Sequence, residues 1–320
     1  MKLRLTLGCL AALHLVILLA PWLAPYDYAE QHRDFPHAPP VRVHFRDAAG
    51  SLHGRPFVYR QYQELPSGQY VESHDRMYFI QFFSRGRLLH VEAPGGLFLC
   101  GTDGLGRDVF SRVLYGGRLS LLTGLVASLL SLSLGLLFGT LAGFYGGWVD
   151  RGLMRGGELF MALPWLYFLL GARAFLPLSI SPVQAFLLLV AIIGTVGWVR
   201  PARLIRGVVL SARESGFVQA ARGFGAGGPY LMRRHLLPLT WNVVLTQATV
   251  LIPQYILAEV TLSFLGLGVG EPVPSWGNML ADARQYHSLV EHAWMLAPGL
   301  ASVPLVLGYL TLADTLLDRR

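Results

Sequence analysis

The sequence predicts an all-α polytopic membrane protein of about six transmembrane helices, with a small β-rich insert after the first helix. Two observations carry this prediction. The 320 residues are 53% hydrophobic and 14% charged, with a mean hydropathy of +0.47, whereas a soluble domain is about 25% charged. Apolar windows of roughly 20 residues, the length that a helix needs to cross a bilayer, occur at 5–23, 119–144, 159–178, 184–199, 239–265 and 294–317.

The first window has features of a secretory leader and of a membrane anchor. Lys2 and Arg4 precede its apolar core, as in a signal peptide. No small-x-small cleavage site follows, and Pro21 and Pro25 break the end of the run. We therefore expect residues 1–24 to form an uncleaved transmembrane anchor.

Basic residues in the short loops predict the orientation, because cytoplasmic loops carry an excess of lysine and arginine. If the six windows cross the membrane in turn, one side of the membrane holds the following basic residues: Lys2, Arg4, Arg151, Arg155, the arginines within 200–234, Arg319 and Arg320. We expect this side and both termini to be cytoplasmic. Residues 119–320 then form a five-helix core with a cytoplasmic loop at 200–238.

Residues 25–118 are expected to lie outside the cytoplasm. The alternating stretches VRVHF and MYFIQFF, with turn signals at AAGS and SRGR, predict a few antiparallel strands. The role of residues 33–97 is open, since the pattern fits a lid or packing surface as well as a docking site.

A short interfacial helix is expected where this insert ends. Thr102 or Asp103 could cap it, and Arg107 and Arg112 could reach lipid headgroups. A metal site at Asp103 and Asp108 is disfavoured, because no histidine or further carboxylate clusters with them.

The stretch GFVQAARGFGAGGPYLMRRHLLP, residues 216–238, predicts a short helix followed by a turn. Ser215 can serve as N-cap, and Gly225 stands where a left-handed C-cap would be. Apolar residues recur at helical spacing at Phe217, Ala220, Ala221 and Phe224. Such a helix could dock on a partner or rest on lipid, with Arg233 and Arg234 binding headgroups.

The same stretch resembles the cytoplasmic signature of the permease subunits of ABC importers. That signature is E-A-A, three residues, a glycine, and a spacer ending in leucine and proline. Here Gln219-Ala220-Ala221, Gly225 and Leu237-Pro238 stand in that register. Gln219 replaces the usual glutamate; it keeps the size and the carbonyl but loses the charge that an ion pair with the ATPase would need.

Other stretches are similar to the dipeptide, oligopeptide and nickel permease branch of this family. They are GTDGLGRDVFSRVLYGGRLSL, FYGGWVDRGLMR, AEVTLSFLGLG and PSWGNMLADAR, in order along 101–284. The resemblance implies a type I ABC importer permease fold in a bacterial inner membrane. It implies import of di- or oligopeptides, with nickel or another small solute as the alternative.

The resemblance also implies partners. The helix would couple the transmembrane path to cytosolic ABC ATPase subunits that use ATP and Mg, through Phe217, Gln219, Ala220, Ala221, Phe224, Gly225, Arg233, Arg234 and Pro238. A second related permease subunit, an extracytoplasmic solute-binding protein and membrane lipid would complete the assembly. No cofactor is expected on this chain itself, because a P-loop requires a lysine and Lys2 is the only one.

Two further groups of residues are candidates for function. Glu259 and Arg173 are ionisable residues within apolar windows. Placing a charge inside a membrane costs free energy, so such residues are by default candidates for function. Glu259 and Ser263, with Trp276 and Asn278 in the last outer loop, could line or gate the path; a structural hydrogen bond at Glu259 and a rigid corner with an interfacial tryptophan are the alternatives. Gly135, Gly139 and Gly143 share a helix face for close packing, within the bundle or against a second subunit.

Other classes of protein fit the sequence less well. The net charge of +7 would suit a nucleic-acid binder, but the arginines cluster beside the apolar windows. Cys9 and Cys100 are too few for a cysteine-built metal site. A secondary transporter would favour paired charges at mid-membrane and two matching halves. An intramembrane enzyme would need a nucleophile spaced against a histidine such as His14, His287 or His292. Neither pattern is present, so we expect no catalytic residue.

Overall fold

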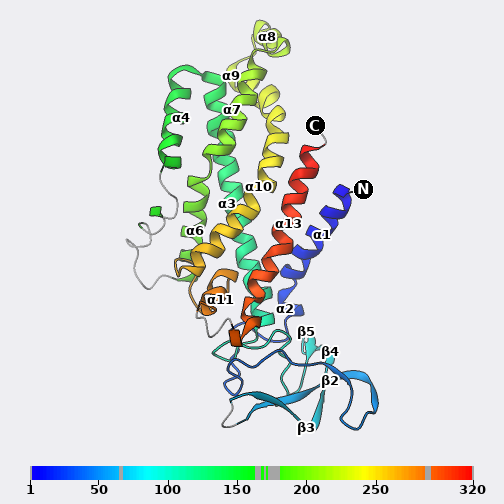
Figure 1. The fold of residues 1–320 in the computed structure, drawn as a ribbon. Helices are drawn as coiled ribbons and strands as arrows, with labels where there is room; N and C mark the ends of the chain where they lie inside the picture. The colour runs from blue at the N-terminus through cyan, green and yellow to red at the C-terminus, as the bar shows by residue number, and fades with distance from the viewer. Residues whose placement is uncertain are drawn as a thin grey trace. The chain divides into compact units, whose positions relative to one another are not determined.

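The computed structural model describes residues 2–64, 68–162, 167–168, 171, 181–284 and 290–318. Within these residues the chain is mostly helical, with two small β-sheets between α2 and α3 (Figure 1). It divides into two compact units. One comprises Met1–Leu7, Leu121–Glu259 and Val306–Arg320, and the other Gly8–Ser120 and Val260–Leu305.

Four helical segments among the described residues are long and apolar enough to cross a membrane. They are α3 (Val109–Tyr145), the joined α6 and α7 (Pro182–Arg213), the run from α9 through α10 (Gly228–Phe264), and η2 with α13 (Ala293–Leu317). The predicted windows at 119–144, 184–199, 239–265 and 294–317 lie on them. The first window forms α1 (Lys2–Leu18) and the short α2 (Ala20–Leu23), which begins just before Pro21. Most of the third window, with Arg173, lies outside the described residues.

The helix α6 (Pro182–Val196) begins with a capping box. The Ser181 hydroxyl accepts from the Gln184 backbone N–H, while the Gln184 side chain accepts from the Ser181 N–H. Two otherwise unsatisfied donors of the helix start are thereby paired. The helix α7 (Val199–Arg213) follows after a short break at Gly197 and Trp198.

Small residues bring α3 and α7 close together in the first unit. A Cβ atom added to Gly139 would lie 2.5 Å from the carbonyl oxygen of Ala202, and one added to Gly143 would lie 2.9 Å from that of Arg206. Gly135 faces Pro201 in the same way, with 2.9 Å to its Cγ. The three glycines therefore pack against α7 of the same chain.

This close packing predicts that Gly139→Ala destabilises the protein. The added methyl would meet backbone rather than a side chain that can move aside, and overpacking costs about 1–3 kcal/mol. Gly207→Ala is the matched control, because it lies on α7 with no atom within 4 Å of its added Cβ. Melting temperatures in mild detergent should fall for Gly139→Ala and not for Gly207→Ala; an equal response would contradict the packing argument.

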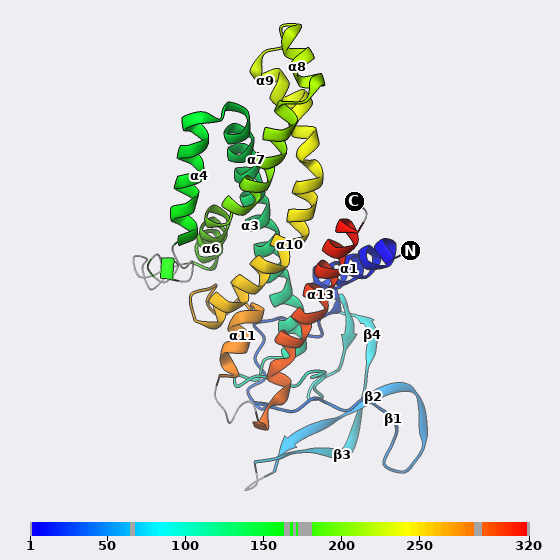
Figure 2. The same ribbon diagram turned by 45° about the horizontal axis from the view of Figure 1, so that its top comes forward.

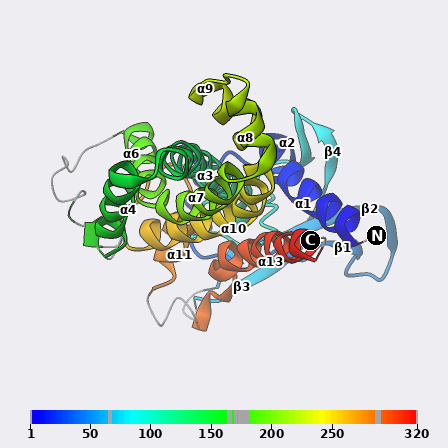
Figure 3. The same ribbon diagram turned by 90° about the horizontal axis from the view of Figure 1, so that it is seen from above.

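The helix α4 (Gly147–Ala162) turns back along α7 (Figures 2 and 3). Gly146 and Gly147 make the turn with φ of +66° and +55°, a region that favours glycine. Ion pairs join the two helices, from Arg206 to Asp150 and from Arg203 to Glu158.

The second unit contains the two sheets. The strands β1 (His44–Arg46), β2 (Leu52–Gln63) and β3 (Tyr70–Phe79) form an antiparallel sheet in the order β1-β2-β3, and β4 (Gln81–Ser84) pairs with β5 (Arg87–His90). Turns form at both predicted sites, with Gly50 and Gly86 at positive φ. The stretch VRVHF is strand only from His44 onward.

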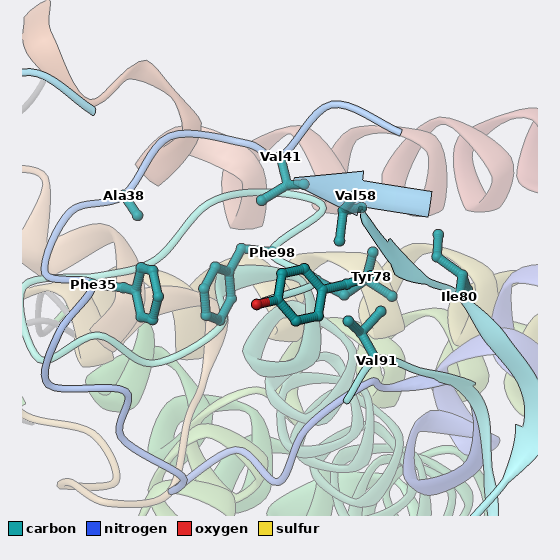
Figure 4. Close-up of a cluster of buried hydrophobic side chains, with 9 residues drawn as sticks. Phe35, Ala38, Val41, Val58, Tyr78, Ile80, Val91 and Phe98 are labelled. Carbon is teal, nitrogen blue, oxygen red and sulfur yellow. The ribbon is translucent and has the colours of Figure 1, made fainter. Parts of the chain in front are cut away.

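A compact apolar core lies beneath these strands (Figure 4). It gathers residues from before, within and after the sheets: Phe35, Ala38, Val41, Val58, Tyr78, Ile80, Val91, Leu97 and Phe98. Burial of this many large side chains, at about 1.5–3 kcal/mol each, gives the region its own stabilising core.

Candidate functional site

The predicted short helix is α8 (Gly216–Gly223), which lies with α9 (Gly228–Leu231) at the ends of α7 and α10 (Leu237–Phe264) (Figures 1 and 2). Ser215 holds the N-cap position, but its hydroxyl donates to the carbonyl of Ala212 at 2.5 Å and caps no N–H. The C-terminal prediction is confirmed. Gly225 has φ of +87°, and the Ala226 N–H donates to the carbonyl of Ala221 at 3.0 Å, which is the Schellman arrangement.

One side of α8 is anchored to the bundle by a residue that the sequence analysis did not select. Val218 is fully buried among Ile205, Val209, Leu231 and Leu236, and Ala221 packs half-buried beside it. The four residues of the predicted apolar face therefore do not all lie on one side. Ala221 packs toward the bundle, whereas Phe217, Ala220 and Phe224 point outward.

Apolar residues are exposed along α8, beside the exposed Gln219 and Arg222. Phe224 is 93% exposed and Phe217 51% exposed, and Ala220 between them is also exposed. An exposed phenylalanine loses the favourable free energy of burial, and a cluster of exposed apolar side chains marks a surface of interaction. This surface, Phe217, Ala220 and Phe224, is called the α8 apolar face below.

Gln219 has a local role that a glutamate could not fill. Its side-chain amide donates to the carbonyl oxygen of Glu214, the C-cap of α7, at 3.1 Å. A carboxylate accepts hydrogen bonds only, so glutamate at this position would lose the bond. The glutamine thus ties α8 to the preceding helix.

The segment between α9 and α10 forms one π-helical turn, η1 (Met232–Leu236). Pro238 lies two positions beyond it and has no N–H to donate; a wider turn there accommodates the missing donor. Arg233, Arg234 and Pro238 are all exposed. Single π-turns inside α-helices are frequent at functional sites.

Glu259 and Ser263 lie near the end of α10 and are both buried. Ser263 packs closely against the following loop: a Cβ added to Gly277 would lie 2.6 Å from the Ser263 Cβ. Burial of Glu259 inside a long apolar helix fits a residue of the path and a structural hydrogen bond equally, so its role in the path stays a prediction.

Trp276 is buried within the protein and is not the interfacial tryptophan that one alternative predicted. It begins α11 (Trp276–Asp282), is 1% exposed, and donates from Nε1 to the carbonyl of Val113 at 3.0 Å. Asn278 completes a capping box with Ser275, and its amide donates to the carbonyls of Val269 and Val273. These bonds make the loop a rigid corner, as the alternative reading predicted. A role of Trp276 or Asn278 in gating stays a prediction.

A buried charge cluster in the second unit was not foreseen. Arg107 pairs with Asp103 (Nε to Oδ2, 2.7 Å) and with Glu271 (Nη1 to Oε2, 2.5 Å). Arg112, on the first turn of α3, reaches Glu271 at 2.9 Å and donates to the carbonyl of Tyr28 at 3.2 Å. The expectation that both arginines reach lipid headgroups is therefore wrong, because the buried Asp103 and the half-exposed Glu271 pair with them instead.

Asp108, rather than Thr102 or Asp103, caps the helix that follows. Its Oδ2 accepts from the N–H and hydroxyl of Ser111, at 2.8 and 2.6 Å. Complete burial raises the pKa of Asp108 to about 7. Three or more metal-binding side chains do not gather anywhere in the described ranges, and the Asp103 carboxylate is occupied by Arg107.

The raised pKa of Asp108 predicts that stability falls as pH rises. The folded state holds the proton up to about pH 7, whereas an unfolded aspartate releases it near pH 4. The stabilisation is thus present at low pH and lost through about pH 7. Asp108→Asn keeps a good N-cap and should flatten the decline in melting temperature between about pH 5 and pH 8. Equal slopes in both proteins would contradict the assignment.

Residues 135–320, more than half of the chain, match the family model of the binding-protein-dependent transport system inner membrane component. The chain belongs to this family. Residues 5–40 match the N-terminal transmembrane domain of oligopeptide transport permease C.

Several members of the family are similar over most of their length. The di/tripeptide transport system permease protein of Pseudomonas aeruginosa is 36% identical over 304 residues, 94% of this chain and 81% of that protein. The dipeptide transport system permease protein of Alkalihalophilus pseudofirmus is 35% identical over 229 residues, 71% and 73% of the two chains. The glutathione transport system permease protein of Pectobacterium atrosepticum is 34% identical over 227 residues, again 71% and 73%.

Proposed function

We propose that this chain is the transmembrane permease subunit of an ATP-driven, binding-protein-dependent importer of di- and oligopeptides. The three relatives described above are named for dipeptides, di- and tripeptides, and glutathione, which is itself a tripeptide. Peptides are therefore the substrate class that the comparisons favour over nickel. The chain would form half of the path, beside a second related permease subunit.

Coupling to ATP is assigned to the α8 apolar face. The observation that carries this proposal is the pair of exposed phenylalanines on a short helix whose other side is held by Val218. A partner groove could bury Phe217 and Phe224, and movement of that partner would be transmitted through Val218 to α7. Cytosolic ATPase subunits would bind and hydrolyse ATP with Mg, and this chain would bind neither.

The proposed arrangement in the bacterial inner membrane follows the positive-inside rule. Both termini, the loop at 200–238 and the α8 apolar face are on the cytoplasmic side, and six helices cross the membrane. The division is 1–24 for the anchor, 25–118 for the outer insert and 119–320 for the core. The insert and the loop with Trp276 would then face the extracytoplasmic binding protein.

Copurification tests the assembly. The chain is purified in mild detergent from its native membrane, and the proteins that accompany it are identified by mass spectrometry. A P-loop ATPase and a related permease are expected, together with ATP-dependent uptake of di- or tripeptides after reconstitution with the binding protein. Recovery of the chain alone, active without ATP, would refute the proposal.

Glu259→Ala is expected to lower peptide uptake while the complex still assembles. A hydrogen bond to a charged group contributes about 1.5–3 kcal/mol. A loss of this size in the transport cycle would lower the rate roughly 10- to 100-fold. Thr261→Ala, an exposed position on the same helix, is the control. Full uptake by Glu259→Ala would remove this residue from the path, and loss of assembly would assign it to structure.

A further inference from the structure

We infer that the groove between α4 and α7 binds the phosphate of an anionic phospholipid. The groove has a volume of about 450 Å³ and is lined by four arginines, two carboxylates and Met154. Both helices belong to the same compact unit and lie side by side (Figures 1 and 3). Nothing in the proposed transport function uses these residues.

The charges of the groove do not cancel. Asp150 is held by Arg206 in a two-pronged pair, with Nη2 to Oδ2 at 2.6 Å, and Glu158 by Arg203 at 3.1 Å. The other two arginines, Arg151 and Arg155, pair with no carboxylate in the part of the chain that the structure describes. Two positive charges thus remain, one turn apart on the exposed surface of α4.

Exposed apolar residues follow the charged residues of the groove along α4. Leu159 follows Glu158 and is 71% exposed, and Phe160 and Met161 beyond it are exposed as well. The predicted third membrane window begins at this same residue 159. On the other side of the charges, exposed Trp148 occupies the first turn of α4, and tryptophan is enriched where a helix meets the headgroup region.

The combination of charge and apolar surface selects the ligand. The guanidinium fork matches two phosphate oxygens, and basic pockets between helices on the cytoplasmic side bind anionic headgroups. Free phosphate or an acidic cytosolic peptide could use the arginines but would leave the apolar surface at Leu159 unused. A zwitterionic lipid brings its own cation, which competes for the phosphate.

Lipid titration monitored by native mass spectrometry tests this inference. The full chain in mild detergent, with its copurified partners, is titrated with phosphatidylglycerol and separately with phosphatidylcholine. Phosphatidylglycerol should bind more tightly. Arg151→Gln with Arg155→Gln should weaken it roughly 30-fold, since each basic residue near a membrane surface contributes about a factor of five.

The matched control is Lys2→Gln with Arg4→Gln, which removes two positive charges from the same predicted side of the membrane but outside the groove. Its affinity should stay within about threefold of the unmodified chain, as expected for distant surface charges. Equal affinity in the groove variant, equal binding of phosphatidylcholine, or full displacement of the lipid by inorganic phosphate would each overturn the inference. Because the measured quantity is lipid affinity, a negative result would overturn this inference without bearing on the proposed peptide transport.

Discussion

Replacing Phe217 and Phe224 together with serine should abolish ATP-dependent uptake while the chain remains folded in the membrane. Phe224 is almost fully exposed and Phe217 about half exposed in the isolated chain, so their replacement should disturb its own packing little. Aromatic side chains at the centre of an interface contribute about 2 kcal/mol or more each, which corresponds to about 30-fold in affinity per residue. The ATPase should therefore no longer copurify, and basal ATP hydrolysis should lose its response to substrate.

Phe83→Ser is the matched control for this experiment. Phe83 is another strongly exposed phenylalanine, at the end of the β4–β5 hairpin in the second unit. Its replacement should leave ATPase binding unchanged. If the α8 variant copurifies with the ATPase as well as the control does, the α8 apolar face is not the coupling surface. Val218→Ala is the complementary variant, since it removes the anchor without altering the apolar face itself.

Arg112→Gln is expected to destabilise the protein strongly. Arg112 is 1% exposed and joins Glu271 to the carbonyl of Tyr28. Removing one partner of a fully buried pair costs about 3–5 kcal/mol. We expect the lower value, because Glu271 is half exposed and Arg107 still pairs with Asp103 and Glu271. For a chain of this size the melting temperature should fall by about 6–12 °C.

Two further variants make this prediction decisive. Glu271 is 46% exposed, so Glu271→Gln retains water as an alternative partner and should cost less than Arg112→Gln. Arg55→Gln, at an exposed arginine on β2, should have almost no effect. If Arg112→Gln shifted the melting temperature no more than Arg55→Gln, the cluster would contribute nothing to stability.

Local patterns in the sequence predicted local features correctly. Gly225 marked the end of α8 because few other residues adopt a positive φ without strain. The turns at Gly50 and Gly86 were visible for the same reason. Four apolar windows became long helices, since an apolar run of that length satisfies its backbone hydrogen bonds only within itself when it lies in lipid.

Features that depend on distant parts of the chain were not predictable in this way. Arg112 looked like a headgroup-binding residue because its partner Glu271 is more than 150 positions away. Trp276 looked interfacial because its neighbours in sequence do not indicate that its Nε1 donates to the distant carbonyl of Val113. Periodicity selected Phe217 and Phe224 on α8, but it could not tell which side of that helix Val218 would bury.

The sequence by itself thus determined that the chain is a membrane permease of this family, where four of its helical spans run, and where α8 ends. These follow from composition, period and short motifs, which act over a few turns of chain. Only the tertiary structure decided which charges are buried in pairs, which glycines meet a backbone, and which side of α8 remains free to bind. Those outcomes depend on burial and on partners far along the chain, and the free energy of a charge or an apolar side chain is set by that environment rather than by its neighbours in sequence.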